Sequence, residues 1–318
     1  MSKWISLGIG LWLVFGLLTS SSQAVEKLNL GTAIKFTPVY YLPVLAAEEK
    51  GYWKERGLQV EWVPFRGGTD MQRAVAAGAI KVGLDTATGL IAGVARGVSV
   101  KIVSDLQATE GVAVWVLADS PMKEPKDLKG AVIGASQIGS TTHAYGRLVA
   151  RALGLEKDVK FIGAGSPMAM NAALKAGKLD GIVSFVFPTA ELKTRGEVRE
   201  LARVIDYRPK PWAAHLIYAE TGFIKRKPET VGAVVKGTLK AVNYIKENPR
   251  WSREKMKSTS RYSDETAKFI YSVFRFTSDG KINRKALENV RNFLIQYGIV
   301  SEAKTPPVEE LYTRKFTR

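Results

Sequence analysis

The sequence predicts an α/β protein built from two similar lobes. Short apolar runs alternate with segments of helical periodicity over most of the first 185 residues. Several of the helical segments end at a glycine, the residue that most readily takes the left-handed conformation after a helix. The two series of elements also align with each other without a gap, at an offset of 99 residues. These three observations together indicate two related halves.

The first series contains four expected strands and three expected helices. Gly51 and Gly78 follow two of the helices. The strands are predicted at Leu28–Ile34, Leu58–Pro64, Ile80–Leu84 and Val100–Ser104, and the helices at Tyr41–Lys50, Asp70–Ala77 and Thr88–Arg96.

The second series repeats this order. Its strands are predicted at Val112–Leu117, Ala131–Ala135, Val159–Ile162 and Gly181–Phe185, and its helices at Thr141–Leu153 and Ala169–Ala176. The stretch "VEWVPFRGGTDMQRAVAAGAIKVGL" from Val60 aligns with "VKFIGAGSPMAMNAALKAGKLDGIV" from Val159. Chance similarity is the alternative, because glycine is common at helix ends. The ungapped register favours two similar lobes.

After Trp212 the pattern changes to amphipathic helices. These are predicted at Pro228–Glu247, Asp264–Phe276 and Ala286–Tyr297, with no strands between them. We therefore expect them to pack on an existing lobe.

The first 24 residues resemble an export signal. Lys3 gives a positive start, Ile5 to Leu18 are predominantly apolar, and Ser22-Gln23-Ala24 fits a small-x-small cleavage site. We expect cleavage after Ala24. A retained membrane anchor is the alternative, although the apolar run is shorter than the roughly 18–20 residues that a spanning helix needs.

Composition excludes several classes of site and partner. The chain has no cysteine, which excludes disulfides, thiolate metal sites, a cysteine nucleophile and a lipid-modified cysteine. Its formal net charge is +17, but the basic residues are scattered. We interpret them as a solvated surface, and export argues against nucleic acid as a partner. A soluble periplasmic protein is expected.

The stretch "GASQIGSTTH" (134–143) resembles a phosphate loop without its lysine. Gly134 and Gly139 have the P-loop spacing, but Ser140 stands where the lysine belongs, so a nucleotide site is not expected. The N-terminus of a helix can still hold an anion through unpaired amides and the helix dipole. The alternative is that Ser140 or Thr141 only caps the helix.

Several strand-to-helix loops are expected to converge if the lobes face each other, because ligands of open α/β sheets lie beyond the carboxyl ends of strands. For Lys35 and Arg66 the alternative is ordinary surface charge, and for Phe185 it is core packing. The candidate ligand-binding residues are Lys35, Phe36, Thr37, Tyr40, Arg66, Gly67, Gly68, Thr69, Asp85, Thr86, Thr88, Ile138, Gly139, Ser140, Thr141, Thr142, Ser166, Phe185 and Phe187.

Catalytic signals are few. His143 and His215 are the only histidines, and neither a His-Glu-x-x-His nor a Gly-x-Ser-x-Gly motif is present. We interpret His143 as a packed or solvent-facing residue rather than a base. No catalytic residue, metal site or cofactor is expected.

The order of these stretches resembles the substrate-binding proteins of ABC importers in the nitrate/sulfonate/taurine family, which includes thiamine-precursor-like domains. The segments that carry it are "PVYYLPVLAAEEKGYWKERGLQVEWVPFRGGTDMQRAVAAGAIKVGLDTAT", "DSPMKEPKDLKGAVIG", "GSTTH" and "NAALKAGKLDGIV". The resemblance implies a two-lobed periplasmic-binding-protein type II fold, with a ligand cleft between lobes joined by two crossovers near Gln107–Val112 and Pro211–Leu216. Residues 25–110 and 216–318 would form lobe 1, and residues 111–215 lobe 2.

The resemblance also implies a function. We expect a monomeric solute-binding component of an ABC importer that takes a small anionic or sulfonate-like solute to an inner-membrane permease. Asp180 lies one residue further from Phe187-Pro188 than is usual in the family, so a more apolar carboxylate is equally open. An enzyme of the same fold using His143 and a sensor for a membrane receptor are the alternatives.

Overall fold

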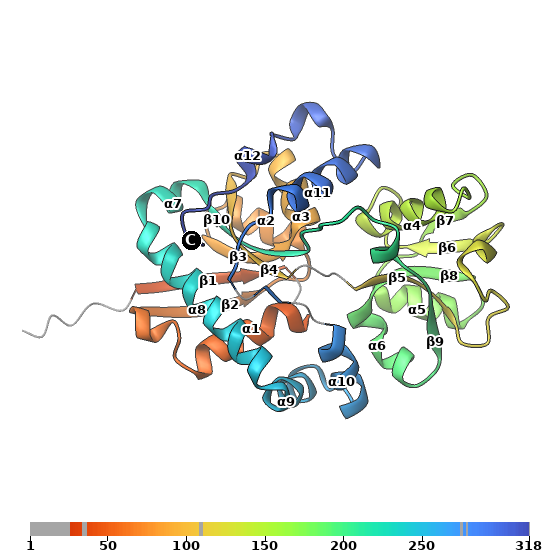
Figure 1. Cartoon of the computed structure of the whole chain (residues 1–318), viewed down its shortest axis with the longest axis horizontal. Coiled ribbons are helices and arrows are strands. Elements are labelled where there is room, and N and C mark those ends of the chain that lie inside the picture. Colours follow the sequence, from red (N-terminus) through yellow and green to blue (C-terminus); the bar gives the residue numbers. More distant parts are fainter. Residues whose placement is uncertain (1–25, 34–36, 108–110, 274–275, 278, 318) are drawn as a thin grey trace, which may run out of the picture.

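The protein contains two five-stranded sheets, each with helices packed around it (Figure 1). The computed structural model describes residues 26–33, 37–107, 111–273, 276–277 and 279–317. The expected signal segment 1–24, with its cleavage site, therefore lies outside the described residues. Figure 1 shows the two sheets side by side, one in each half of the molecule.

The first sheet has the strand order β2-β1-β3-β10-β4 and the second has the order β7-β6-β8-β5-β9. Within each sheet the first three strands in the order pair in parallel, and the fourth is antiparallel to both of its neighbours, so that four strands run in one direction. The strands are β1 (Glu26–Thr32), β2 (Leu58–Pro64), β3 (Val82–Thr86), β4 (Val100–Gln107), β5 (Val112–Leu117), β6 (Val132–Ala135), β7 (Lys160–Gly163), β8 (Gly181–Phe185), β9 (Val198–Arg203) and β10 (His215–Glu220).

Helices pack against both sheets and continue through the C-terminal third. They are α1 (Pro38–Glu49), α2 (Gly68–Ala76), α3 (Ala87–Ala95), α4 (Thr141–Ala152), α5 (Pro167–Lys175), α6 (Val186–Thr194), α7 (Thr221–Arg226), α8 (Pro228–Glu247), α9 (Pro249–Ser260), α10 (Asp264–Val273), α11 (Arg284–Gln296) and α12 (Val308–Leu311). Short 3-10 turns lie at Lys54–Arg56, Pro125–Leu128, Val204–Asp206 and Glu302–Lys304.

The offset of 99 residues relates whole elements of the two halves. It carries the bounds of α2, β3 and α3 onto those of α5, β8 and α6, residue for residue. The prediction of two similar α/β halves is therefore confirmed at the level of elements and of strand order.

Two strands follow passages of the chain from one sheet to the other. β5 follows the passage after β4, and β10 follows the passage after β9. Each is the antiparallel strand of its sheet. The crossovers expected near Gln107–Val112 and Pro211–Leu216 fall in these two passages, although residues 108–110 lie outside the described residues. The division into lobes at residues 110/111 and 215/216 stays a prediction.

The sequence did not predict β9, β10, α6, α7, α9 and α12. β9 has the sequence VRELAR, and its three charged residues obscure the apolar pattern of a strand. α6 has Pro188 in its first turn, which does not look like a helix in the sequence. β10 is buried between two strands, although only helices are expected after Trp212. The three helices predicted in this region are present as α8, α10 and α11. α10 is described over Asp264–Val273, residues 274–275 lie outside the described residues, and Phe276 is not helical.

The core is apolar on both faces of the central strands. β3, β5 and β8 have buried residues at almost every position, as expected for strands covered by helices on two sides. Trp115 of β5 is fully buried, and its indole N–H donates a hydrogen bond to the Ser184 carbonyl at 3.0 Å.

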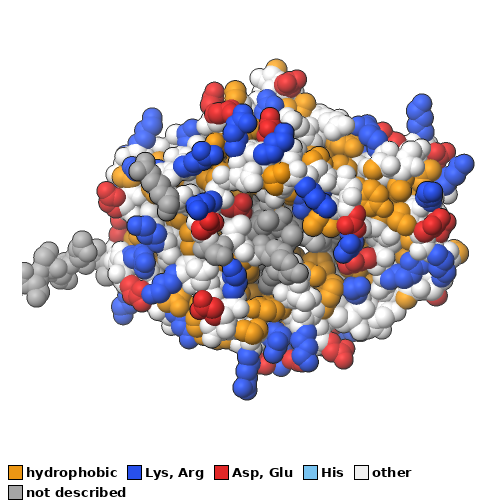
Figure 2. Space-filling model, in the orientation of Figure 1, with side chains coloured by type: hydrophobic (Ala, Val, Ile, Leu, Met, Phe, Trp, Pro, Cys, Tyr) orange, Lys and Arg blue, Asp and Glu red, His pale blue; other side chains and the backbone are white. Residues whose placement is uncertain are grey.

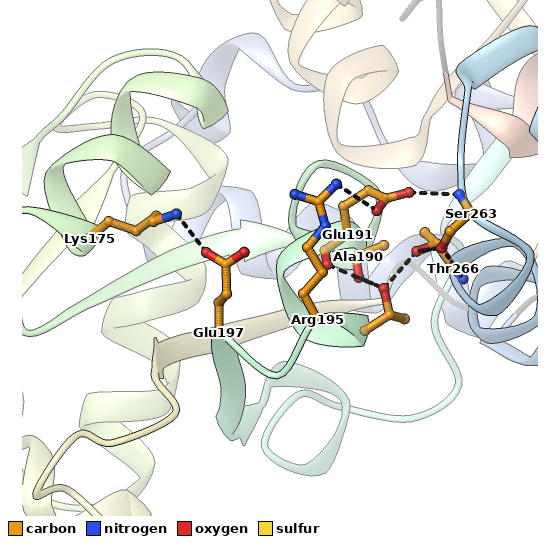
Figure 3. A network of polar contacts seen from close by, with 8 residues as sticks. Lys175, Ala190, Glu191, Arg195, Glu197, Ser263 and Thr266 are labelled. Atoms are coloured by element: carbon orange, nitrogen blue, oxygen red, sulfur yellow. Dashed lines mark hydrogen bonds and ion pairs between the residues drawn. The ribbon is translucent and has the colours of Figure 1, made fainter.

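Helix α10 also connects the C-terminal helices to α6 of the second half. The Glu191 carboxylate accepts a hydrogen bond from the backbone N–H of Ser263 at 2.9 Å (Figure 3). The hydroxyls of Thr194 and Thr266 are also hydrogen-bonded to each other. α9 packs in turn against α1 and α8. This bridge adds a side-chain connection between the halves to the two backbone passages.

The charged side chains are dispersed over the visible surface. Figure 2 shows lysine and arginine interspersed with acidic and apolar side chains rather than gathered into one patch. This agrees with the interpretation of the net charge of +17 as a solvated surface. No described helix is both long and apolar enough to cross a membrane.

Candidate functional site

A cavity of about 910 Å³ is lined by residues from both halves of the molecule. Among the described residues, six helices place their N-cap residue in its wall. These N-cap residues are Thr37 of α1, Gly67 of α2, Thr86 of α3, Ser140 of α4, Ser166 of α5 and Phe185 of α6. The cavity is therefore surrounded by the positive ends of helix dipoles.

Side-chain caps fix where three of these helices begin. The hydroxyls of Thr86, Ser140 and Ser166 accept hydrogen bonds from the backbone N–H groups three residues ahead. Ser140 therefore caps α4, as one of the two interpretations expected, and whether it also binds a ligand stays a prediction. The amides of Thr141 and Thr142 occupy the first two positions of α4 and have no acceptor within the helix, so they can still serve a ligand.

The hydroxyls of Ser136, Ser140 and Thr142 form a cluster in the wall of the cavity. Each oxygen lies 2.9–3.0 Å from the other two. The Thr142 oxygen also accepts the backbone N–H of Ser136 at 3.0 Å. The cluster fixes the turn before α4, and hydroxyls that bond to each other in this way have few donors left for a ligand.

Asp85 is a buried carboxyl group in the wall of the cavity. Its residue is only 2% exposed, and its Oδ1 accepts the backbone N–H of Thr86 at 2.7 Å. Oδ2 is buried without a hydrogen-bond partner among the described residues. Burial raises the pKa of Asp85 to about 7, against the opposing effects of the Thr86 amide, Gln72 and Arg96.

Gln72 and Arg96 support the wall beside Asp85. The Gln72 amide donates to the Gly89 carbonyl at 2.8 Å and accepts from the Arg96 guanidinium at 2.8 Å. This arrangement ties α2 to α3. Both side chains line the cavity, with Gln72 buried and Arg96 exposed.

His215 lines the cavity from β10 as a neutral side chain. Burial lowers its pKa to about 3, and its Nδ1 has no hydrogen-bond partner among the described residues. Tyr40 packs edge-on against it, with ring centroids 5.2 Å apart. Tyr40 is fully buried and is not part of the wall, although it was a candidate.

Most of the predicted residues are brought together in the cavity wall, whereas Tyr40 and Ile138 are not. Ile138 is 60% exposed outside the cavity. Lys35 and Phe36 lie outside the described residues. The residues found in the wall are Thr37, Arg66, Gly67, Gly68, Thr69, Asp85, Thr86, Thr88, Gly139, Ser140, Thr141, Thr142, Ser166, Phe185 and Phe187.

Arg66 is at the rim of the cavity. Its side chain is 96% exposed and lies 3.8 Å from the Asp70 carboxylate, a weak surface pair. Phe185 and Phe187 give the opposite half an apolar section of wall, and Phe185 is partly exposed rather than packed wholly in the core.

His143 is not in the cavity wall. Its Nδ1 accepts the backbone N–H of Gly139 at 3.0 Å, and its ring packs edge-on against Phe161. Burial and the nearby Arg147 lower the pKa of His143. Its geometry is that of a residue that stabilises the first turn of α4.

The polar wall residues that the sequence did not predict as site residues are Gln72, Arg96, Ser136, Gln137, Ser184 and His215. Ser136, Gln137 and Ser184 lie in loops that were expected to converge on the site. Gln72 and Arg96 lie within the expected helices rather than in the loops, and β10 was not expected at all. Their helical spacing gives no signal by itself. Within the described parts of the chain, no group of three or more histidine, aspartate or glutamate residues is placed to hold a metal ion.

Comparison with known proteins agrees with this architecture. The model of the family described as NMT1/THI5 like matches residues 39–252, about two thirds of the chain. The chain belongs to the NMT1/THI5-like family.

Curated relatives of this NMT1/THI5-like chain include both a binding protein and a synthase. It is 24% identical over 207 residues to the formylaminopyrimidine-binding protein of Halalkalibacterium halodurans, covering 64% of this chain and 62% of the relative. It is 25% identical over 228 residues to the 4-amino-5-hydroxymethyl-2-methylpyrimidine phosphate synthase THI13 of Saccharomyces cerevisiae, covering 66% and 64%. The aligned region thus spans less than two thirds of either relative.

The solved structure of the periplasmic aliphatic sulphonate binding protein SsuA from Escherichia coli superimposes with a TM-score of 0.77 at 17% identity. The match covers 91% of this chain and 92% of SsuA. The NMT1/THI5-like chain therefore has the periplasmic-binding-protein fold predicted from its sequence.

Proposed function

We propose that the protein is the solute-binding component of an ABC importer and holds a small organic solute in the cavity between its two halves. The observation that carries this proposal is the convergence of six helix N-termini from both halves on one cavity of about 910 Å³. A site made in this way binds polar groups through amides and dipoles. Two halves joined by two backbone passages can close on the solute by a hinge motion.

We further propose the lobes as residues 25–110 with 216–318, and residues 111–215. The protein would act as a monomer in the periplasm after removal of residues 1–24, and would deliver the solute to an inner-membrane permease. The positive start and apolar run of those residues support export. N-terminal sequencing of the protein from the periplasmic fraction is expected to begin at Val25. A start at Met1 in the membrane fraction would support the anchor instead.

The ligand remains a class rather than a compound. Helix N-termini and Arg66 favour an anionic group such as a sulfonate or carboxylate, as expected from the sequence. The name of the relative from Halalkalibacterium halodurans adds a formylaminopyrimidine to the compounds to test.

We propose binding without chemical turnover. His143, the base of the enzyme alternative, is not in the cavity wall. His215 is in the wall, but its pKa of about 3 makes it a poor base at neutral pH. Because several relatives are named synthases, turnover is a defined alternative. Product formation from a bound compound that His143→Ala or His215→Asn abolishes would favour an enzyme.

The test is a calorimetric screen with sulfonates, carboxylates, nitrate and pyrimidines. We expect one class to bind with a single site and to raise Tm. Thr69→Glu places a negative charge at the second position of α2, in the cavity wall and at a helix end that favours acidic residues. It should leave folding intact and weaken an anionic ligand at least tenfold.

Gln59→Glu is the matched control, because it adds the same charge on an exposed position of β2 outside the cavity. Equal loss of binding in both variants would contradict the assignment of the cavity. Binding that neither variant changes would also contradict an anionic ligand held at α2.

A further inference from the structure

We propose that Asp85 selects the solute, by accepting a hydrogen bond from a nitrogen donor group such as an amine, an amidine or an amino-substituted ring. This inference rests on the proposed solute-binding function and narrows the class of solute. It replaces the expectation of a simple oxyanion with a solute that carries a nitrogen donor.

The geometry of the carboxyl group leaves one oxygen for the solute. Oδ1 is held by the Thr86 amide at 2.7 Å, which fixes the orientation of the group. Oδ2 has no hydrogen-bond partner among the described residues, yet Asp85 lines the cavity and is 2% exposed. A buried carboxylate oxygen without a partner is costly, so the group that satisfies it is expected to come from the ligand.

Two glycines make room around this carboxyl group. A Cβ atom at Gly68 would lie 3.1 Å from Oδ2, and a Cβ atom at Gly89 would lie 3.1 Å from Oδ1. Gly68 belongs to α2 and lines the cavity. Its missing side chain therefore leaves space beside the buried Oδ2 on the side of α2.

The groups around Asp85 offset its charge only in part, because burial raises its pKa more than the Thr86 amide, Gln72 and Arg96 lower it. Arg96 donates to Gln72 rather than to Asp85, and Tyr218 faces Asp85 from β10 as a neutral phenol whose pKa is raised by burial and by that carboxylate. His215 is also neutral. An oxyanion beside an ionised Asp85 would be repelled, whereas an ammonium or N–H group would be attracted.

Because the pKa of Asp85 is about 7, the affinity for the solute is expected to change between pH 6 and pH 8. A nitrogen donor binds the ionised carboxylate, so affinity is expected to rise from pH 6 to pH 8. A solute that needs the protonated acid as a donor, or an oxyanion repelled by the carboxylate, would show the opposite trend. Tyr218 and His215 do not change charge over this range, because burial raises the pKa of the phenol and lowers that of the imidazole to about 3.

The experiment uses pairs of probes that differ in one amino group. The pairs are ethanesulfonate with 2-aminoethanesulfonate, propanoate with 3-aminopropanoate, and 2-methylpyrimidine with 4-amino-2-methylpyrimidine. Each is titrated calorimetrically into the mature protein at pH 6 and pH 8. In at least one pair we expect the amino member to bind at least tenfold more tightly. The 2-aminoethanesulfonate ammonium group stays charged at both values, so its trend reports on the protein.

Three variants locate the effect. Asp85→Asn keeps an oxygen for the Thr86 amide but makes the second group a donor, so the preference for the amino member should vanish. Gly68→Ala places a methyl group against Oδ2 and should weaken the amino member while leaving the carboxyl charge in place. Asp70→Asn removes a partly exposed charge from α2 outside the cavity wall and should leave the preference unchanged.

The outcomes separate this inference from the proposed function. Suppose that Thr69→Glu weakens binding, but that neither the amino group of the probe nor Asp85→Asn changes the affinity. That result would overturn the role of Asp85 and leave the proposed function standing. Affinity that falls from pH 6 to pH 8 would overturn it as well. Failure of every probe to bind would overturn both proposals.

Discussion

The hydroxyl oxygens of Thr194 and Thr266 lie 2.6 Å apart and join α6 to α10. Thr194 also donates toward the Ala190 and Glu191 carbonyls, while Thr266 accepts from the Ser263 hydroxyl at 2.8 Å. Figure 3 shows Glu191, Ser263 and Thr266 in one network, with Arg195 on the other side of Glu191. Because α10 packs on α9, and α9 packs on α1 and α8, this contact links the two halves, and we expect a movement of one half against the other to strain it.

We expect the two threonines to be energetically coupled. Thr194→Val and Thr266→Val should each lower the free energy of unfolding by about 1 kcal/mol, the usual net value of a hydrogen bond. The double variant should show a coupling energy of roughly 0.5–1.5 kcal/mol in urea unfolding.

Thr305→Val is the control for this cycle. Thr305 is a buried threonine whose hydroxyl donates to the Ser301 carbonyl, far from α6 in the described network. Its effect should add to that of Thr194→Val. A coupling between Thr194 and Thr266 no larger than that of the control pair would contradict a bridge through these hydroxyls.

Asp85→Asn is expected to stabilise the protein without ligand, and more so at high pH. The folded pKa of about 7 lies above the value of 3.8 for a free aspartate, so the folded state holds the proton more tightly. Stability from this group is therefore lost as pH rises from about 4 to about 7 and is constant above that. The difference corresponds to roughly 4 kcal/mol.

Urea unfolding of both proteins at pH 5 and pH 8 checks this prediction. The advantage of Asp85→Asn should be larger at pH 8, whereas Asp70→Asn should show no such increase. A variant that is less stable at pH 8 would show that the carboxylate is satisfied in the folded protein.

His215 is expected to act in the opposite direction. Burial lowers its pKa from 6.5 to about 3. Between these two pH values the unfolded chain binds a proton at His215 that the folded protein does not bind. Stability from His215 is thus present above about pH 6.5 and lost as pH falls toward 3. Between pH 4 and 6.5 the effects of Asp85 and His215 cancel in part.

Single substitutions should therefore expose each effect. In Asp85→Asn, stability should fall more steeply with acid between pH 6.5 and pH 4 than in the unsubstituted protein, because only His215 is left. In His215→Asn the fall should be shallower than in the unsubstituted protein. Parallel pH profiles of all three proteins, measured by thermal unfolding, would refute the opposing shifts.

The sequence predicts the repeated parts of the fold best. α2 and β3 and their counterparts 99 residues later, α5 and β8, were all predicted, whereas α3 was predicted and its counterpart α6 was not. The loops before these helices supply most of the predicted site because strand-to-helix junctions can be recognised locally. β10 was missed since a strand that enters a sheet after a long passage has no local partner that identifies it.

Asp85 illustrates the limit of prediction for the site. Asp85 was predicted as a binding residue in the loop after a strand. Its role, however, depends on which carboxyl oxygen is hydrogen-bonded and on which residues surround the group. Gln72 and Arg96 reach it only because α2 and α3 pack together. Such contacts follow from tertiary packing rather than from any pattern along the chain.

Gly93 tests how closely α2 and α3 must approach to build this wall. A Cβ atom at Gly93 would lie 2.6 Å from Gln72 Cδ and 2.7 Å from its Oε1, so Gln72 would have to leave its bonds to Gly89 and Arg96. Glycine to alanine inside a helix normally stabilises by about 1 kcal/mol. Gly93→Ala should instead destabilise by roughly 1–3 kcal/mol, the usual result of overpacking a core.

Gly232→Ala in α8 is the matched control for Gly93→Ala, because its nearest neighbour would be Phe316 at an ordinary 3.6 Å. Chemical unfolding should therefore show opposite signs for the two variants. Loss of Gln72 from its place should also weaken any solute that binds beside Asp85, and Gly232→Ala should not. Two variants of the same sign would mean that α2 and α3 can separate without cost, and that Gln72 does not hold the wall of the cavity.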